Sequence, residues 1–430
     1  MLDKTIENIN QKIRKEIIQP GMDNIALNYI LTRNIPESIK HFFNQEVEIW
    51  LRDEADKFSS SDKFDYDAPE IQMLVDKIFD KLKQTATFSM NQFNLLLERA
   101  VKLEANYLLR PHQTLTQFLF RDNTTITTIE VYNTLKYFEK YTYYKDAFTE
   151  YFNKKYLREI SQSQFEELIN GVDEQVFSKN PVEMTLQVTK SIINFLNEGQ
   201  DINVDKIPLD IISAAFTDRK LDNFSSLIEK EQKAGTVEIT ISELEQMLRN
   251  GKTLKELKAA PVSETTKIEE IADIEKEKPE LEVESIAVSD KIETPEAVVE
   301  EEEEVEEGYE EEEEEEEIEE AKVSSSAVDA LASAMGDKLK ATNLADLNTY
   351  ISPKQRKKFV KKVFNKKDKQ YEEIITVLNK TPNWKQASNI IDDFFMKMNI
   401  NPYSRDALEF SDLMYNRYFP KDISHKKSEF

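Results

Sequence analysis

Apolar residues recur at helical spacing from the start of the chain. The first series, with 4-3-4 spacing, consists of Leu2, Ile6, Ile9 and Ile13. A second series follows Pro36 and consists of Ile39, Phe42, Phe43, Val47 and Trp50. Residues spaced in this way share one face of an α-helix, and proline is favoured in the first helical turn. We therefore predict two amphipathic helices here, the first of which can pack within its own chain or against a second copy.

Further stretches with the same periodicity run up to residue 258. They cover 70–83, 89–109, 127–157, 160–170, 181–197, 208–232 and 243–249. Prolines and glycines mark the expected breaks, at Pro69, Pro111, Gly171, Pro181, Gly199 and Gly235. No internal repeat of fixed period is present. The pattern predicts an all-α domain over 1–258, built as one body or as two subdomains.

Only two segments resemble β-strands. Residues 124–131 are rich in β-branched side chains, and residues 237–241 alternate weakly between apolar and polar. Each also precedes a helix-capping pattern, Thr127 with Glu130 and Ser242 with Glu245. We expect either one small hairpin or two extended lead-ins to helices.

Helical periodicity returns near the C-terminus. The clearest series consists of Ala387, Ile390, Ile391, Phe394, Phe395 and Met398. Its spacing is that of one continuous helix face. We predict a small helical bundle over 326–420, with a basic first helix, followed by a flexible tail over 421–430.

The segment between the two helical regions carries almost the whole net charge. Residues 259–320 hold 29 acidic side chains and four lysines, which gives −25 of the formal −26 of the whole chain. Residues 300–320 include 17 glutamates in 21 positions. Like charges four positions apart repel in a helix, and so few apolar residues cannot offset the entropy of ordering. The chain is therefore expected to be all-α, with a long disordered polyacidic linker over 259–325 between the two helical domains.

Composition excludes several kinds of site. The chain has no cysteine, which removes disulfides, thiolate metal sites and cysteine nucleophiles, and only seven glycines, which disfavours phosphate-binding loops. Charged residues fill the first 20 positions where an export signal would be apolar, and no apolar run is long enough to cross a bilayer. We expect a cytoplasmic protein.

No catalytic, cofactor-binding or metal-binding residue can be assigned. Gly251, Lys252 and Thr253 resemble the end of a phosphate-binding loop, but Gln246 stands where that loop needs a glycine. A helix end at Gly251, with Thr253 and Glu256 capping the next helix, explains the same residues. The three histidines are far apart in the sequence and lack a Glu-x-x-His pair. We predict neither a cofactor nor an enzyme, although a helical active site built from dispersed residues would leave no local pattern.

A cluster of basic residues follows the acidic tract. Residues 353–370 contain nine basic side chains against Asp368: Lys354, Arg356, Lys357, Lys358, Lys361, Lys362, Lys366, Lys367 and Lys369. A basic helix over 353–369 can bind phosphate backbones, an anionic membrane surface or an acidic protein. It can equally be the solvated outer face of the bundle. The acidic tract ends only about 30 residues earlier, so a further hypothesis is that the tract folds back and masks this helix.

An aromatic segment over 132–156 is the other candidate for partner binding. One helical stripe consists of Tyr137, Tyr141, Tyr144, Phe148 and Tyr151, and we expect it to be buried in the core. Tyr132, Tyr143 and Tyr156 lie off that stripe and are a candidate partner groove. Aromatic side chains among lysines can stack on bases, which is the alternative interpretation of this segment.

These observations favour a non-enzymatic scaffold protein. Its two helical domains, joined by a polyanionic tether, would each hold a protein partner, and the tether would favour basic partners. The alternative is a nucleic-acid-binding protein that uses the helix over 353–369 and is masked by the acidic tract. A third alternative is an enzyme whose helical site the sequence does not reveal.

Overall fold

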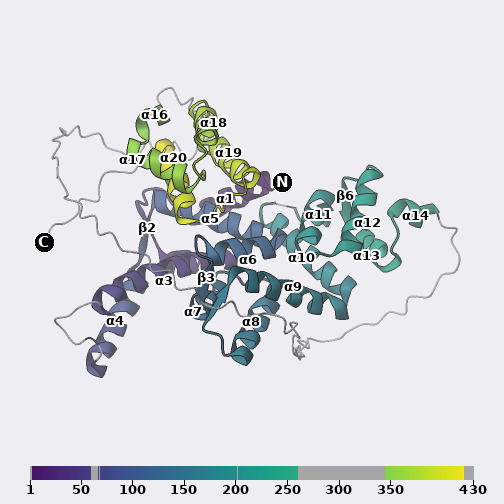
Figure 1. Cartoon of the computed structure of the whole chain (residues 1–430), viewed down its shortest axis with the longest axis horizontal. Helices are drawn as coiled ribbons and strands as arrows, with labels where there is room; N and C mark the ends of the chain where they lie inside the picture. Colours follow the sequence, from purple (N-terminus) through teal and green to yellow (C-terminus); the bar gives the residue numbers. More distant parts are fainter. Residues whose placement is uncertain (1, 60–65, 67, 201, 260–343, 421–430) are drawn as a thin grey trace, which may run out of the picture. The chain divides into compact units, whose positions relative to one another are not determined.

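The computed structural model describes residues 2–59, 66, 68–200, 202–259 and 344–420 (Figure 1). The chain divides into two compact units, and all the described residues belong to the first, which combines Met1–Ile286 with Ala341–Phe430. The predicted linker covers 259–325, but Ala259 is the last residue of a helix, and the remainder of the linker lies outside the described residues. The first part of the predicted bundle, over 326–343, and the tail over 421–430 also lie outside them. Within the described ranges there are 19 helices and six three-residue strands, so the predicted all-α class is confirmed.

The helices up to residue 259 are connected by short segments. They are α1 (Asp3–Ile17), α2 (Leu27–Leu31), α3 (Glu37–Ser59), α4 (Pro69–Thr85), α5 (Met90–Leu109), α6 (Pro111–Phe120), α7 (Thr128–Leu135), α8 (Thr142–Lys155), α9 (Gln162–Lys179), α10 (Pro181–Glu198), α11 (Leu209–Asp218), α12 (Asp222–Lys233), α13 (Ile241–Asn250) and α14 (Leu254–Ala259). The predicted first helix is confirmed, and it packs on α5 of its own chain. The Arg14 side chain donates a hydrogen bond to Asn94 of α5 at 2.9 Å.

Three antiparallel strand pairs give this part of the chain a repeated organisation. The strands are β1 (Asn24–Ala26), β2 (Thr87–Ser89), β3 (Thr125–Thr127), β4 (Glu159–Ser161), β5 (Lys206–Pro208) and β6 (Glu238–Thr240), and they pair as β1–β2, β3–β4 and β5–β6. In every pair the central residues face each other, as Ile25 with Phe88, Ile126 with Ile160 and Ile207 with Ile239. All six of these side chains are buried. Each strand leads directly into a helix, so three pairs of helix–strand–helix units follow one another along the chain.

The sequence favours this abrupt change from strand to helix. At the ends of β2, β3, β4 and β6, a serine or threonine caps the following helix through a capping box. In β6, for example, the Thr240 backbone N–H donates to Glu243 at 2.9 Å, and the Glu243 N–H donates to the Thr240 hydroxyl at 3.2 Å. The capping residue has extended backbone angles, so it serves as the last strand residue and the start of the helix.

The structure corrects four details of the sequence prediction. The strand-like segments belong to two different pairs and form no hairpin with each other, whereas the alternative of extended lead-ins to helices is confirmed at α7 and α13. The capping residue of α13 is Thr240, because the chain is already helical at Ser242. The helix α9 continues through Gly171 to Lys179, since the apolar residues on both sides of the glycine stay buried along one face. The single helix predicted over 127–157 is divided into α7 and α8, with Tyr141 at φ 54° between them.

The break before α8 has a visible cause in the packing. The Tyr107 hydroxyl on α5 donates to the Lys140 carbonyl at 2.8 Å, and the Tyr141 hydroxyl donates to the Leu108 carbonyl at 3.2 Å. These bonds hold the segment between α7 and α8 against α5 in a non-helical path. The predicted helix end at Gly251 is confirmed, because Gly251 ends α13 at φ 62° and Thr253 caps α14 together with Glu256.

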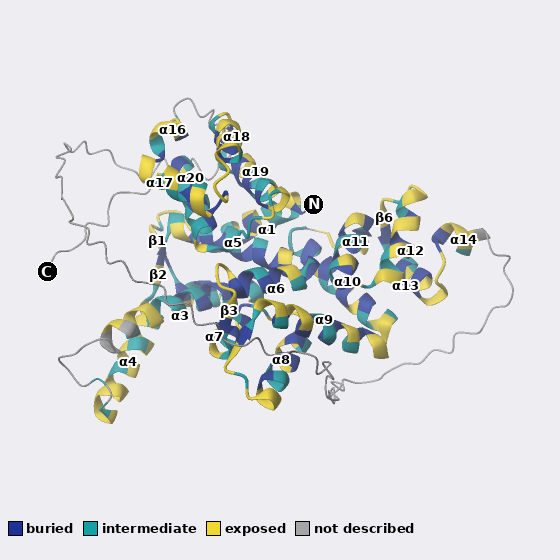
Figure 2. Cartoon of the chain, viewed as in Figure 1, coloured by how far each residue is buried: buried dark blue, intermediate teal, exposed yellow. Residues whose placement is uncertain are grey.

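The C-terminal region forms its own buried cluster. Its helices are α16 (Leu347–Tyr350), α17 (Pro353–Lys362), α18 (Asp368–Asn379), α19 (Trp384–Lys397) and α20 (Arg405–Tyr418). Phe359, Phe364 and Phe410 pack edge to face at its centre. Buried side chains line the inner sides of these helices, whereas α17 turns many exposed residues outward (Figure 2). The basic helix is shorter than predicted: it ends at Lys362, because Asn365 and Lys366 adopt left-handed backbone angles before α18 begins.

Candidate functional site

Seven exposed lysines lie close together in the sequence on α17, on the turn that follows it and at the start of α18. We call this group the lysine face, and it consists of Lys354, Lys357, Lys361, Lys362, Lys366, Lys367 and Lys369. Phe359 and Val363 on the opposite side of the helix are buried, which fixes the direction of these lysines toward solvent. Lys361 and Lys362 lie in the last turn of α17, where the helix dipole favours positive charge. None of the seven makes an ion pair with another described residue within 4 Å.

The remaining two basic residues of this segment are neutralised within the bundle. Arg356 pairs with Glu372 at 2.5 Å, and Lys358 pairs with Asp406 at 3.2 Å as well as with Glu409. Their carboxylate partners come from α18 and α20, so these contacts join three helices. The predicted anion-binding set is thus divided into two structural residues and seven outward-facing lysines. Binding of an anion at these lysines stays a prediction.

A network of buried polar side chains fastens the C-terminal helices to α5. Glu98 of α5 accepts hydrogen bonds from the Trp384 indole at 2.7 Å and from the Ser388 hydroxyl at 2.6 Å. Lys102, one turn further along α5, contacts Glu98 at 2.9 Å and Asp392 at 2.6 Å. Glu98 and Lys102 are only 13% and 23% exposed. The three partners on α19 are spaced four residues apart and therefore face α5 together.

The charges of this network stabilise one another. Burial alone would lower the pKa of the Lys102 ammonium, but Glu98 and Asp392 outweigh burial and hold that pKa above its ordinary value. Burial would likewise raise the pKa of Glu98, whereas Lys102, Ser388 and Trp384 together hold it below its ordinary value. Both groups are therefore charged near neutral pH. No sequence pattern indicated this network, because its two halves are far apart in the chain and only the fold unites them.

Further contacts extend the same junction along α5 and α6. Tyr403 packs edge to face on Phe118, with ring centres 5.2 Å apart, and its hydroxyl accepts a hydrogen bond from the Asn106 amide at 3.1 Å. Asn401 donates to the Gln117 carbonyl at 2.9 Å, and Arg99 pairs with Asp412. The bundle that includes the lysine face is therefore attached to the N-terminal helices through α19, α20 and the segment between them.

The three tyrosines of the predicted partner groove lie in different surroundings. Tyr132 is half-buried against Phe152, and Tyr143 is half-buried with its ring 4.4 Å from that of Tyr144. Tyr156 is 91% exposed and follows the last residue of α8. Tyr143 and Tyr156 are at opposite ends of α8, about 20 Å apart at 1.5 Å per residue. The structure thus does not gather all three on one short groove, and their binding of a partner stays a prediction.

A buried polar cluster lies among α6, α8, α9 and α11. The Asp173 carboxylate, 2% exposed, accepts a hydrogen bond from the Tyr144 hydroxyl at 2.8 Å and lies 2.7 Å from His112 Nε2. Arg219 is equally buried, donates to the Ala215 and Leu108 carbonyls, and stacks on the Tyr141 ring. The cluster holds the start of α6 and the end of α11 together. Sequence reasoning missed it, since only the fold brings these residues into contact.

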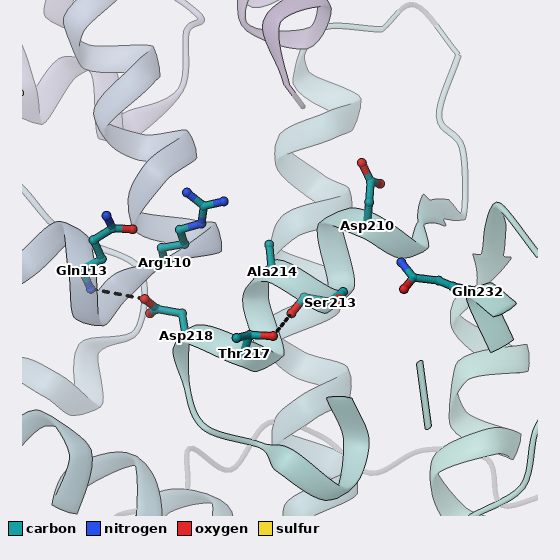
Figure 3. Close-up of a pocket in the computed structure, with 8 residues that line it drawn as sticks. All are labelled: Arg110, Gln113, Asp210, Ser213, Ala214, Thr217, Asp218 and Gln232. Atoms are coloured by element: carbon teal, nitrogen blue, oxygen red, sulfur yellow. Dashed lines mark hydrogen bonds between the residues drawn. The ribbon is translucent and has the colours of Figure 1, made fainter. Parts of the chain in front are cut away.

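A pocket near this cluster has a volume of about 410 Å³ and lies between α6 and α11 (Figure 3). Two carboxylates, Asp210 and Asp218, line it. Both oxygens of Asp218 accept hydrogen bonds from backbone N–H groups of α6, from His112 at 2.8 Å and from Gln113 at 3.3 Å. Those bonds give partners to backbone N–H groups in the first turn of α6, which have no acceptor within the helix. The Asp218 carboxylate is thereby occupied as a helix cap.

The helix–strand–helix units share their order of elements with the calcium-binding EF-hand. An EF-hand takes its oxygen ligands from a long loop between the helices. Here the connections before the strands range from the single residue Ala86 to residues 199–205. The first helical turns after β3 and β6 contain the glutamates Glu130 and Glu243. Each of these carboxylates accepts a hydrogen bond from a backbone N–H group in a capping box. Among the described residues, no group of three or more histidines and carboxylates could hold a metal ion.

Comparison with known proteins adds one local match. The sequence model of a family described as a domain of unknown function (DUF8457) matches residues 348–419. This range includes α17 to α20 and the whole lysine face. No curated protein and no solved structure matches the chain. Within the part of the chain that the structure covers, no helix has the length and apolar content needed to cross a membrane.

Proposed function

We propose that this chain is a non-enzymatic scaffold protein that binds an acidic protein partner through the lysine face. The observation that carries the proposal is the difference between the two groups of basic residues in 354–369. Arg356 and Lys358 are neutralised by carboxylates of the bundle, whereas the seven lysines of the lysine face have no such ion pair among the described residues. A localised positive surface attracts anionic partners even on a chain with a net charge of −26.

The attachment of the bundle to α5 supports a scaffold role. The contacts of Glu98, Lys102 and Tyr403 join α19 and the segment after it to the larger set of helices, and α19 shares its buried cluster with the helix α17 of the lysine face. A partner bound at the lysine face would therefore be held beside the N-terminal helices. The cytoplasm remains our proposed location for this function.

Nucleic-acid binding at the same surface is the second candidate function. The density of positive charge favours it, because seven lysines within 16 residues suit a regular row of phosphates. We further propose that the acidic residues 300–320 compete for the lysine face and mask it. Removal of that segment would then strengthen the binding of any external polyanion.

The test uses the full-length chain and a triple variant, Lys361→Glu with Lys362→Glu and Lys366→Glu. Fluorescence anisotropy would measure the binding of two labelled probes, a glutamate-rich peptide and a single-stranded oligonucleotide, over a range of salt concentrations. A control variant with Lys190→Glu, Lys230→Glu and Lys255→Glu changes three other exposed lysines and the net charge by the same amount. The triple variant should weaken binding more than tenfold, and the control should not.

The choice of probe separates the two candidate functions. Tighter binding of the peptide supports the protein-scaffold proposal. Tighter binding of the oligonucleotide, with a salt dependence that loses about one unit of slope per lysine removed, supports the nucleic-acid alternative. Both measurements are repeated on a chain that lacks residues 300–320. If neither probe binds either chain, or if the control variant weakens binding equally, the proposed role of the lysine face is wrong.

A further inference from the structure

Helix α4 exposes an apolar surface that no other described residue buries. The sequence predicts an amphipathic helix here, and α4 confirms it, yet not one of its residues is buried. The exposed side chains with helical spacing are Ile71 at 39%, Leu74 at 59%, Ile78 at 47% and Leu82 at 43%. In Figure 2, α4 carries exposed and intermediate colours along its length. We call these four residues the α4 stripe.

The position of α4 explains why the stripe stays uncovered. The helix packs against α2 and α3, with Lys83 paired to Glu48 of α3 and the Gln84 carbonyl accepting a hydrogen bond from the Asn28 amide. These contacts hold the C-terminal end of α4, while the four side chains of the stripe stay 39–59% exposed. Folded chains rarely leave a contiguous apolar surface of this kind exposed unless it binds something.

The charges beside the stripe indicate what that occupant is. At 100° per residue, Glu70, Lys77 and Lys81 lie along one edge of the stripe, with the negative charge near the start of the helix and Lys81 near its end. A second α4 running antiparallel, with Leu74 of one copy on Ile78 of the other, brings Glu70 of each copy within one residue of Lys81 of the other. In a parallel pair this edge would instead lie against the opposite edge of the partner helix, which holds Val75 and Phe79, so Glu70 would meet no lysine there. Lys77 of each copy comes within two residues of Lys77 of the other in the antiparallel pair, so the edge combines two pairs of opposite charge with one of like charge, and the balance favours the antiparallel direction.

We propose that the α4 stripe is a self-association surface, on which a second copy of this chain binds through its own α4 in antiparallel orientation. The resulting two-fold contact buries both stripes and forms the Glu70–Lys81 pair twice. Because it involves none of the lysine face, it can be right or wrong independently of the proposed function.

Sedimentation equilibrium or light scattering on the full-length chain tests this proposal. Either method gives the mass directly, so the expansion expected of a highly charged chain does not disturb the result. At tens of micromolar, the wild-type chain should have twice the 50.2 kDa of a single copy and dissociate on dilution. Leu74→Asp with Ile78→Asp should give a monomer with an unchanged circular dichroism spectrum, since both side chains are exposed. Ile129→Asp with Val237→Asp alters two other exposed apolar residues and should leave the dimer intact.

Charge reversal then tests the antiparallel direction. Glu70→Lys alone should weaken self-association, because the new ammonium group of each copy then faces Lys81 of the other. Lys81→Glu alone should also weaken it, because the new carboxylate of each copy then faces Glu70 of the other. An equal mixture of the two variants should restore a dimer with one copy of each, since both pairs again unite opposite charges. A wild-type chain that stays monomeric, or a dimer that survives the aspartate substitutions, would overturn the proposal. Failure of the mixture to associate would overturn the antiparallel orientation.

Discussion

Replacing Lys102 by methionine removes the central cation of the junction between α5 and α19 while keeping the length of its side chain. Glu98 would keep its hydrogen bonds from Trp384 and Ser388 but lose the ammonium group 2.9 Å away, and Asp392 would lose its partner at 2.6 Å. Glu98 is 13% exposed, so little water can replace the missing charge. The substitution leaves two carboxylates close together without a cation between them.

The expected loss follows from the burial of these groups. Removing one partner from a fully buried ion pair costs about 3–5 kcal/mol. Glu98 retains two donors and Asp392 is half-exposed, so we expect about 2–3 kcal/mol here. A double variant that combines Lys102→Met with Glu98→Gln removes one of the two carboxylates that Lys102→Met leaves without a cation. The double variant should therefore be less destabilised than the sum of the single variants, by about 1 kcal/mol.

Urea unfolding followed by circular dichroism measures these differences. The matched control is Lys83→Met, which breaks the pair between Lys83 and Glu48 on two helices, with both side chains at least about a third exposed. Such pairs contribute at most about 1 kcal/mol, so the control should stay close to wild type. If Lys102→Met costs no more than Lys83→Met, the buried network does not hold the junction and the reasoning fails.

Two further predictions concern the N-terminal helices. Burial, and to a lesser extent the nearby Glu104 carboxylate, raises the pKa of Glu198 to about 8. Between pH 4.5 and 8 the folded chain therefore keeps a proton on Glu198 that the unfolded chain, with a carboxyl pKa near 4.5, has already released. The free energy of unfolding should therefore fall as pH rises from about 4.5 to about 8. Urea titrations of Glu198→Gln should show this fall reduced by on the order of 2 kcal/mol. A variant with the same pH profile as the wild-type chain would contradict this role of Glu198. Thr240→Ala should cost about 1 kcal/mol through loss of the α13 cap, whereas Ser242→Ala should cost almost nothing. Equal effects of the two substitutions would show that Thr240 is not the capping residue.

The class and most helices of this fold follow from the sequence pattern. The series from Leu2 to Ile13 and from Ala387 to Met398 became α1 and α19, because regular spacing of large apolar residues strongly determines a helix face. The repeated pairing of short strands did not follow. Each strand has only three residues, and the intervals between paired strands vary from 32 residues between β5 and β6 to 63 between β1 and β2, so no fixed period reveals them.

A weaker signal for these units is present in hindsight. Ile126–Thr127, Ile160–Ser161 and Ile239–Thr240 each place an isoleucine before a capping residue, with glutamate or glutamine three positions after the cap. Four of the six strands end in a capping box. Local chemistry therefore identifies the strand-to-helix change, but it does not identify which strand is the partner.

Side chains that depend on tertiary contacts were the least predictable. The sequence identified nine basic residues but not that Arg356 and Lys358 are neutralised by α18 and α20. It identified α4 as amphipathic but not that its apolar face stays exposed, because periodicity shows which residues share a face and not what lies against it. The buried groups Glu98, Lys102 and Asp173 look like ordinary surface residues in the sequence.

The central claim is tested most directly by fluorescence anisotropy. A labelled glutamate-rich peptide is titrated with a chain from which only residues 300–320 have been deleted. We predict binding that falls as salt rises and that is lost in the variant Lys361→Glu, Lys362→Glu, Lys366→Glu but kept in the control variant at Lys190, Lys230 and Lys255. Absence of binding, or equal binding by both lysine variants, would contradict the assignment of partner binding to the lysine face.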